Sequence, residues 1–183
     1  PFITGKIACS KDKFTFYKKF KYITNKYSRK FAHILRYKNE GLLISYKTIN
    51  ADNPYLNCRL NGLVNFSPKI LVIDKYLNTK ITSNIVSNAK NLKTYIFYAS
   101  SNDKKINLFK SKKINLIKVR LNHYNEFDIK EILKKIYKLG ISNILFEGGK
   151  NLTEVFLQSG FINQFYLIQS NKLLKNNGKL NIN

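Results

Sequence analysis

Cysteine, proline and glycine are scarce in this sequence, and methionine and tryptophan are missing. Its 183 residues include two cysteines, three prolines and eight glycines. Cys9 and Cys58 provide neither a disulfide framework nor a C-x-x-C metal pair, so we expect a reducing, cytoplasmic compartment. No apolar run approaches the ~20 residues that span a bilayer, and no signal-peptide pattern opens the sequence, so we expect no membrane segment. The first residue is Pro1 rather than methionine, which indicates an excised or processed piece.

Acidic residues are also few. The chain has 10 Asp and Glu against 33 Lys and Arg, which gives a formal net charge of +23. Of the basic residues 29 are lysine and 4 arginine, alongside 24 asparagines and 22 isoleucines, a bias typical of A/T-rich codons. Because nucleic-acid readers depend on arginine for bidentate and stacked contacts, we expect no nucleic-acid partner. An anionic small substrate and cofactor would still be attracted by this charge.

Several catalytic motifs are missing. The sequence has no H-x-E with P-C-x-x-C, which excludes zinc-dependent deaminase chemistry, and neither a Walker loop nor G-x-S-x-G. His33 and His123 are isolated from each other, so we expect no metal site. The length and the 44% hydrophobic content predict one domain over residues 1–183 with a substantial core.

Apolar runs alternate with helical patterns along the chain, which predicts an α/β architecture with a mostly parallel central sheet. We expect strands at residues 2–9, 42–45, 70–73, 95–98, 115–119, 143–146 and 164–169. We expect helices from Thr24 or Asn25 to about residue 38, at 128–139, and from the Gly-Gly turn to about 159. On the first helix, the predicted inward residues are Tyr27, Phe31, Ile34 and Leu35. We interpret residues 11–21 as a mobile flap and 101–113 as a loop.

The most unusual local pattern is ILFEGGKNLT at residues 144–153. An apolar strand ends in Glu147, two adjacent glycines follow, and an amphipathic helical pattern begins at once. Glycine lets backbone N–H groups approach an anion closely, and a helix N-terminus carries positive partial charge. We therefore predict a phosphate site at Gly148 and Gly149, with the Glu147 carboxylate beside the nucleotide. The alternative is a tight turn with a solvent-facing carboxylate.

A second candidate cluster lies around the first predicted strand. Lys6, Ala8 and Ser10 share one face because strand side chains alternate, and Asp12 follows. A lysine among apolar neighbours is costly unless it meets an anion or a carboxylate. The alternative, which composition alone favours, is an edge-strand lysine in a lysine-rich chain.

A third cluster is KTINADNPYLNCR at residues 47–59. Thr48 and Asp52 would leave the second strand toward a ligand, although Asp52 also begins a simple turn signal. Arg59, together with Arg36 of the first helix, would clamp a phosphate bidentately. The alternative is a structural ion pair of these arginines with Glu40 or Asp52.

Taken in order, these segments resemble the reductase domain of the bacterial riboflavin-biosynthesis deaminase/reductase, a relative of the dihydrofolate reductase fold. The matching pieces are KIACSKD, YITNKYSRKFAHILR, LLISYKTINADNPYLNCR, ILVID and ILFEGGKNLTEVFLQSGFINQFYL. The resemblance implies a three-layer domain and an NADPH-dependent reduction of a phosphorylated ribosylamino-pyrimidine. Hydride would reach C1′ as the ribose ring opens to a ribityl chain. It also implies a homodimer and a possible deaminase partner.

The resemblance also implies cofactor contacts. Tyr22 stands where the family has a tryptophan beside the cofactor, while Thr48 and Asp52 fall at cofactor- and ribose-contacting positions. Further cofactor positions are Ala8 and the phosphate-cradling segment, which comprises Gly148, Gly149, Lys150, Asn151, Leu152 and Thr153 and continues to Val155.

Substrate contacts are implied in the same way. Arg36, Leu56 and Arg59 match substrate-binding positions, with the arginines facing the 5′-phosphate, and Glu147 matches an acid near the reacting ribose. Ring opening requires a proton at the departing ring oxygen, so a positioned acid is needed. The candidates are Lys6, Asp52 and Glu147, and the sequence does not divide the work among them.

The chain departs from the family pattern in two places. Its flap, KFTFYKKFKY, is bulky, and the closing strands expected near the C-terminus are missing or unrecognisable in LKNNGKLNIN, as if truncated. A lost strand would expose a sheet edge. These departures leave an alternative, a non-catalytic remnant that serves as a folding or dimerisation module beside a deaminase. The deaminase half is not in this sequence.

Overall fold

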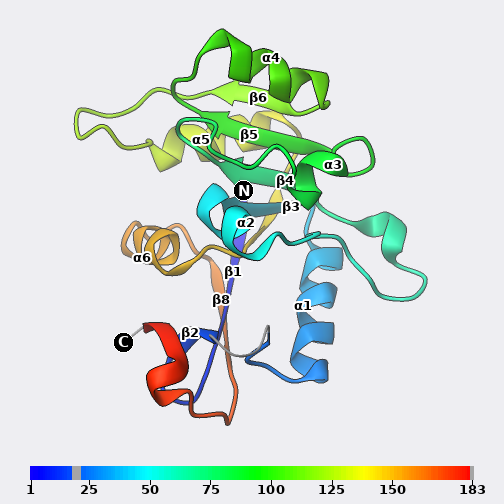
Figure 1. Ribbon diagram of the computed structural model, residues 1–183, viewed down its shortest axis with the longest axis vertical. Helices are drawn as coiled ribbons and strands as arrows, with labels where there is room; N and C mark the ends of the chain where they lie inside the picture. The colour runs from blue at the N-terminus through cyan, green and yellow to red at the C-terminus, as the bar shows by residue number, and fades with distance from the viewer. Residues whose placement is uncertain (18–21, 182–183) are drawn as a thin grey trace.

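The computed structural model describes residues 1–17 and 22–181 and has a seven-stranded sheet at its centre (Figure 1). The strand order is β6-β5-β4-β3-β7-β1-β8, and each of its pairings is parallel. The strands are β1 (Phe2–Cys9), β3 (Gly41–Ser45), β4 (Lys69–Ile73), β5 (Thr94–Tyr98), β6 (Asn115–Lys118), β7 (Asn143–Phe146) and β8 (Gln164–Gln169). All seven predicted strands are confirmed within a residue or two.

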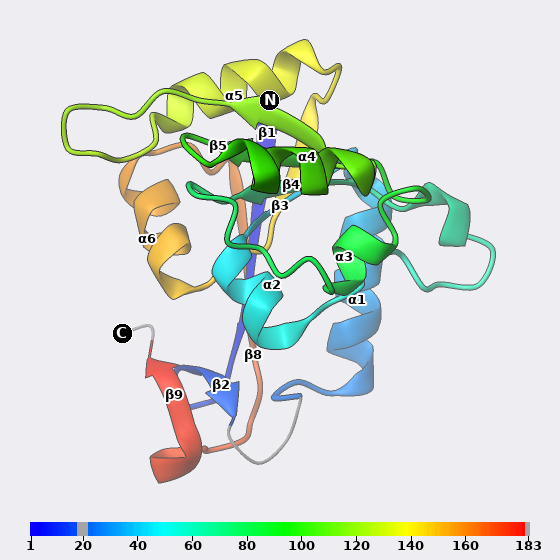
Figure 2. The same cartoon turned by 45° about the horizontal axis from the view of Figure 1, so that its top comes forward.

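Helices cover both faces of this sheet. They are α1 (Lys26–Lys38), α2 (Tyr46–Asp52), α3 (Asn84–Ser87), α4 (Asp103–Ser111), α5 (Ile129–Lys138) and α6 (Lys150–Gln158), with 3-10 turns at Val64–Phe66 and Lys175–Asn177. Alternate strand residues point to opposite faces, so Leu42 packs with residues of α1 to α4, whereas Leu43 packs with α5 and α6. Figure 2 shows the same three layers after a 45° turn. The predicted three-layer α/β architecture is confirmed.

The two longest predicted helices form with the expected ends. Asn25 caps α1, its side chain accepting a hydrogen bond from the Ser28 N–H at 2.9 Å, and Asp128 caps α5. The inward placement of Tyr27 is wrong, because its side chain is 83% exposed. Tyr27 lies in the first turn of α1, at the end of the helix farthest from the buried Leu35, and its side chain projects into solvent.

Three helices are missing from the sequence-based prediction. The predicted loop at 101–113 contains α4, where the Asn102 side chain caps the helix and Phe109 is buried against the sheet. Lysine and asparagine are common throughout this chain, so their abundance there was not a loop signal. Helix α2 begins directly after β3 at Ser45, and α3 has only four residues.

The C-terminal segment departs from the prediction in an informative way. Residues Phe14–Tyr17, within the predicted flap, form β2, and Gly178–Asn181 form β9, which pairs with β2 in antiparallel fashion. A closing strand therefore exists, contrary to the prediction, but it joins a separate two-stranded sheet. As expected from a missing partner, β8 remains at one edge of the seven-stranded sheet. The rest of the predicted flap, residues 18–21, lies outside the described residues.

Asp12 fastens this C-terminal segment. Its carboxylate accepts hydrogen bonds from the backbone N–H groups of Leu174, at 3.0 Å, and Lys175, at 2.8 Å, and from the Ser10 hydroxyl at 2.6 Å. Burial acts to raise the pKa of Asp12, but these hydrogen bonds outweigh it and lower the pKa to about 2. Asp12 and Ser10 therefore have a structural role here.

We expect Asp12→Ala to lower the melting temperature and to speed amide hydrogen exchange at residues 174–181, because it removes the acceptor of those amides. Since the folded pKa lies below the unfolded one, the stabilisation by Asp12 is present above about pH 4 and is lost as the pH falls toward 2. Asp103→Ala, at the start of α4, is the control. Unchanged exchange at residues 174–181 in Asp12→Ala would contradict this role.

Candidate active site

Three charged side chains meet at the carboxyl end of β7. Gly5 of β1 pairs with Phe146 of β7, so the next residues of the two strands, Lys6 and Glu147, come side by side. Arg36, in the last turn of α1, donates from Nε to Glu147 Oε1 at 3.2 Å and from Nη2 to Oε2 at 3.0 Å. The Lys6 Nζ lies 3.7 Å from the same Oε2. The structure therefore brings Lys6 of the second cluster, and the Arg36 that was paired with the third, to Glu147.

This cluster is nearly shielded from solvent, with side-chain exposures of 14% for Lys6, 13% for Arg36 and 11% for Glu147. Burial alone would raise the pKa of Glu147. The charges of Lys6 and Arg36, and the hydrogen bonds from Arg36, outweigh burial and lower the pKa to about 2. Glu147 is therefore a carboxylate at neutral pH. While both cations remain in place it cannot act as the proton donor.

The two predicted phosphate-binding arginines differ in their surroundings. Arg36 uses Nε and Nη2 on Glu147, and its Nη1 donates to the Asn57 carbonyl at 3.3 Å, so its fork is occupied. Its partner is Glu147, not Glu40 or Asp52. The Arg59 side chain is exposed and forms no ion pair with a carboxylate of the described residues. Arg59 is therefore the arginine that is available to an incoming anion.

The Gly-Gly turn lies between a buried ring and α2. A Cβ on Gly148 would stand 2.2 Å from Cζ of Phe146, so only glycine fits above that ring. Phe146 is itself stacked on Phe156 of α6 with 4.4 Å between ring centroids, which fixes the helix on the strand. Neither glycine has a positive φ. The lack of space for a side chain, rather than an unusual backbone conformation, explains why both positions are glycine.

Gly149 is the N-cap residue of α6 and has no side chain with which to cap the helix. The first backbone N–H groups of α6, those of Lys150, Asn151 and Leu152, therefore lack a capping side chain at their end of the helix. A Cβ on Gly149 would lie 3.2 Å from Oγ1 of Thr48, so the Thr48 hydroxyl stands next to these amides. The structure thus brings together two predicted cofactor segments that are about 100 residues apart in sequence.

The other predicted residues occupy distinct places. Thr48 and Asp52 lie one turn apart on α2, a helix that the sequence analysis missed, and Asp52 is exposed at its end. Leu56 is only 2% exposed and has a φ of 57°, so its side chain belongs to the core and only its backbone is available to a substrate. The Thr153 hydroxyl donates to the Gly148 carbonyl at 3.3 Å and stabilises the turn. Ala8 is half-buried on β1.

Tyr22 precedes α1, with its ring 4.6 Å from the guanidinium carbon of Arg29. Arg36 lies ten residues beyond Lys26 on the same helix, roughly 15 Å along its axis. In this arrangement Tyr22 stands at the opposite end of α1 from the Glu147 cluster.

His33, a lone histidine of α1, also belongs to this site. Its Nδ1 accepts a hydrogen bond from the Arg59 N–H at 3.3 Å, and Arg36 is one turn further along the same helix. The spacing of His33 and Arg36, three residues apart on a predicted helix, was the signal that could have indicated a shared face.

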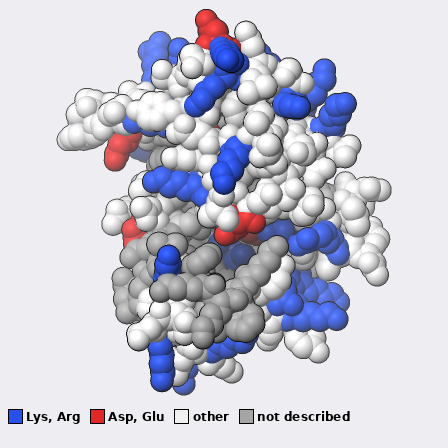
Figure 3. Space-filling view, in the orientation of Figure 1, with Lys and Arg blue, Asp and Glu red and all other residues white. Residues whose placement is uncertain are grey.

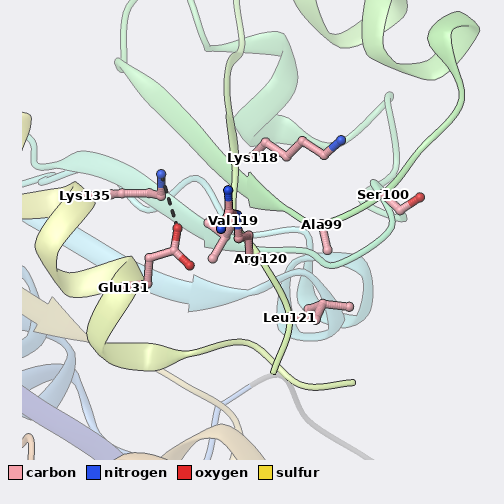
Figure 4. Close-up of a pocket in the computed structure, with 8 residues that line it drawn as sticks. All are labelled: Ala99, Ser100, Lys118, Val119, Arg120, Leu121, Glu131 and Lys135. Carbon is pink, nitrogen blue, oxygen red and sulfur yellow. Dashed lines mark ion pairs between the residues drawn. The ribbon is translucent and has the colours of Figure 1, made fainter. Parts of the chain in front are cut away.

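A separate hollow lies beyond the ends of β5 and β6 (Figure 4). It has a volume of about 720 Å³ and contains none of the candidate residues. Glu131 and Lys135, one turn apart on α5, form an ion pair at 3.4 Å along one side of it. On the face shown in Figure 3, basic side chains are spread widely and not gathered in one stripe.

Two kinds of feature are absent from residues 1–17 and 22–181. No helix there is long and apolar enough to cross a membrane. No three His, Cys, Asp or Glu side chains there are grouped so that they could hold a metal ion.

The fold and the site define the class as a dihydrofolate-reductase-like α/β domain. The sequence model of the RibD C-terminal domain family matches residues 1–180, and the chain belongs to that family.

Relatives of known name support the assignment. The chain is 27% identical over 154 residues to riboflavin biosynthesis protein RibD of Actinobacillus pleuropneumoniae, covering 84% of this chain and 40% of that protein. It is 25% identical over 136 residues to the 2,5-diamino-6-ribosylamino-4(3H)-pyrimidinone 5′-phosphate reductase of Debaryomyces hansenii, covering 66% and 53%. RibD of Acinetobacter baumannii has the same fold, with a TM-score of 0.81 at 21% identity over 100% of this chain and 49% of that one. The chain thus spans about half the length of these relatives, or less.

We expect Glu147→Gln to lower the free energy of unfolding at pH 7 by about 3 kcal/mol, because two buried cations lose their counter-charge. The folded pKa of Glu147 lies below its usual 4.5, so this stabilisation is present above that value and disappears as the pH falls toward 2. Urea unfolding of both proteins across this pH range measures it. Glu131→Gln, which breaks an exposed pair, should cost well under 1 kcal/mol. A Glu147→Gln deficit that does not change with pH would contradict the assignment.

Proposed function

We propose that this chain reduces 5-amino-6-(5-phosphoribosylamino)uracil to the ribitylamino product with NADPH, as an oxidoreductase of riboflavin biosynthesis. The observation that carries the proposal is the ionised Glu147, held by Lys6 and Arg36 directly before a Gly-Gly turn and a helix N-terminus. The family membership and the named reductase relative support it.

The residues present fit a dinucleotide phosphate. A Cβ at Gly149 would fill the space beside the Thr48 hydroxyl, and the first amides of α6 follow directly after Gly149 with no capping side chain. Gly148, Gly149 and the first turn of α6 would hold the diphosphate, with Thr48 as a hydrogen-bonding side chain. Asp52, one turn further on α2, would contact a ribose. We propose that Ala8 also contacts the cofactor. Tyr22 would contact the cofactor only if the segment before α1 came closer to the Glu147 cluster.

The chemistry requires two events at the substrate. The bond between C1′ and the ring oxygen breaks, the oxygen takes a proton, and C1′ accepts a hydride. NADPH supplies that hydride when bound. Because Glu147 is ionised, we assign the proton to the Lys6 ammonium, which Glu147 orients at 3.7 Å. Glu147 would in addition accept hydrogen bonds from the substrate's ribose, and the shielded setting of the cluster would exclude water.

The substrate phosphate would be bound mainly by Arg59. Its guanidinium is exposed and without an ion pair among the described residues, whereas the Arg36 fork is engaged by Glu147. Arg36 would then neutralise and orient Glu147. This assignment modifies the expectation of a clamp formed equally by both arginines.

The alternative function, a non-catalytic remnant, predicts a site whose charged residues have lost their partners. The intact Lys6–Glu147–Arg36 cluster argues against it. An assay that follows nicotinamide absorbance during incubation with NADPH and the pyrimidine substrate separates the two. Oxidation of NADPH that depends on substrate supports the reductase, and neither binding nor oxidation supports the remnant.

We further propose a homodimer and a deaminase partner, either fused or separate. Strand β8 is an edge of the seven-stranded sheet, and its Leu167 is 47% exposed, which suits pairing with a second copy. The mass in solution by light scattering measures this. Cys9 and Cys58 are buried free thiols, in keeping with a cytoplasmic location.

We expect Gly149→Ala to weaken NADPH binding about tenfold, because its methyl group would crowd Thr48 and the amides beside it. Fluorescence titration with NADPH measures the affinity. The double variant Gly149→Ala/Thr48→Ala removes the crowding and the hydroxyl together, so its affinity should stay below that of the wild type. A double variant with wild-type affinity would show that Thr48 does not contact the cofactor.

We expect Arg59→Ala to raise the KM for the phosphorylated substrate roughly 10- to 100-fold, the cost of losing a charged hydrogen bond. The KM for a dephosphorylated analogue should change little. Arg120→Ala, at the separate hollow in Figure 4, controls for the loss of one positive charge. Equal losses on both substrates would remove Arg59 from the phosphate site.

A further inference from the structure

One turn of α1 fastens the segment that carries Arg59. The Arg36 Nη1 donates to the Asn57 carbonyl at 3.3 Å, the Cys58 Sγ donates to the His33 carbonyl at 3.6 Å, and the Arg59 N–H donates to His33 Nδ1 at 3.3 Å. Three consecutive residues, 57 to 59, are therefore each tied to His33 or Arg36. Of these three hydrogen bonds, the one from the Arg59 N–H has an acceptor that can be protonated, the His33 imidazole.

The Arg59 contact defines the state of the imidazole. A ring nitrogen that accepts a backbone N–H must be unprotonated, so His33 is neutral and carries its proton on Nε2. A proton on Nδ1 would face the Arg59 N–H and abolish the hydrogen bond.

The charges around His33 favour the neutral ring. Arg36 lies on the same helix, Arg59 on the facing segment and Glu147 after β7, and the Asn57 backbone carbonyl also faces the ring. The Asn57 carbonyl and Glu147 favour protonation, and the two arginines oppose it. Burial, followed by the charges of Arg36 and Arg59, lowers the pKa of His33 below 6.5. The hydrogen bond therefore persists at neutral pH and would weaken in acid.

The other contacts that hold residues 57 to 59 in place involve residues that precede Arg59 in this segment. Leu56 is in the core, and Cys58 is buried with its N–H donating to the Ser67 hydroxyl at 3.0 Å. After Arg59 the chain turns outward to the exposed Asn61 and Gly62. The hydrogen bond from the Arg59 N–H to His33 is thus the contact that holds the backbone at Arg59. The Arg59 guanidinium itself has no ion pair with a described residue.

We propose that His33 is a positioning residue for phosphate recognition: its neutral imidazole accepts the Arg59 backbone N–H and thereby fixes the direction in which Arg59 meets the phosphate group of the substrate. The proposal rests on the proposed function in that Arg59 binds a sugar phosphate. His33 would touch neither the phosphate nor the reacting atoms. Because its imidazole can be protonated, binding of the phosphate would depend on pH.

The test is the affinity for ribose 5-phosphate, measured by calorimetry on the chain between pH 5 and pH 8. His33→Leu removes the acceptor and should weaken binding about tenfold at pH 7.5, the loss of one hydrogen bond that orients a charge. His33→Asn places Oδ1 on the same Cγ and should restore most of the affinity. His123→Asn is the matched control and should bind as the wild type does.

The pH profile distinguishes positioning from general stability. Affinity should fall in both proteins as the phosphate of the ligand takes up a proton at pH ~6. The wild type should show an additional loss as His33 titrates, and His33→Asn should lack that additional loss. Nitrogen-15 NMR of the two histidines should show His33 as the Nε2–H tautomer with a midpoint below 6.5. A protonated Nδ1 at pH 7.5, wild-type affinity in His33→Leu, or a loss of affinity in acid that is as large in His33→Asn as in the wild type would overturn the proposal.

These outcomes are separable from failure of the proposed function. A chain that binds ribose 5-phosphate but never oxidises NADPH would refute the reductase, while the affinity series would still decide the role of His33. A chain that oxidises NADPH but binds ribose 5-phosphate equally well as wild type and as His33→Leu would refute the role of His33 alone. A wild-type chain that does not bind ribose 5-phosphate would also overturn it.

Discussion

The ion pair of Glu147 with Arg36 is the contact on which the geometry of the candidate site depends. It connects the end of β7 to α1, 111 residues earlier, and Lys6 of β1 joins from the neighbouring strand. A nearly buried carboxylate is tolerated only because two cations approach it, and each cation is tolerated because of the carboxylate. The same pair directs the remaining Arg36 nitrogen to the Asn57 carbonyl, so the geometry of the Arg59 segment depends on it.

The local architecture around that pair follows from packing. Phe146 and Phe156 stack within the core, which places α6 over β7 and leaves room for only glycine above the ring. The turn that results exposes the first amides of α6 beside Thr48, a few residues from the carboxylate. The proposed cofactor site and the Glu147 cluster therefore adjoin because one strand ends where one helix begins.

Much of this could be predicted from sequence, where local pattern decides structure. The apolar strands, the caps of α1 and α5, and the Gly-Gly turn have signals within ten residues. Helix α4 was missed because its Lys and Asn composition is that of the whole chain, and β9 because a strand of GKLN forms only through its pairing with β2. Lys6, Arg36 and Glu147 were each identified, but their meeting depends on strand register, and the role of His33 on contacts with residues 58 and 59. Contacts between residues so far apart in the chain cannot be predicted from the local pattern of a single sequence.

We propose that a dinucleotide lies with its diphosphate on the first turn of α6 and its reactive ring toward Lys6 and Glu147. The decisive experiment is a crystal structure of the chain with NADPH. We expect phosphate oxygens within hydrogen-bonding distance of the backbone amides after Gly149 and of the Thr48 hydroxyl, with the nicotinamide directed to the Glu147 cluster. A dinucleotide bound elsewhere, for instance in the hollow beyond β5 and β6, would contradict it.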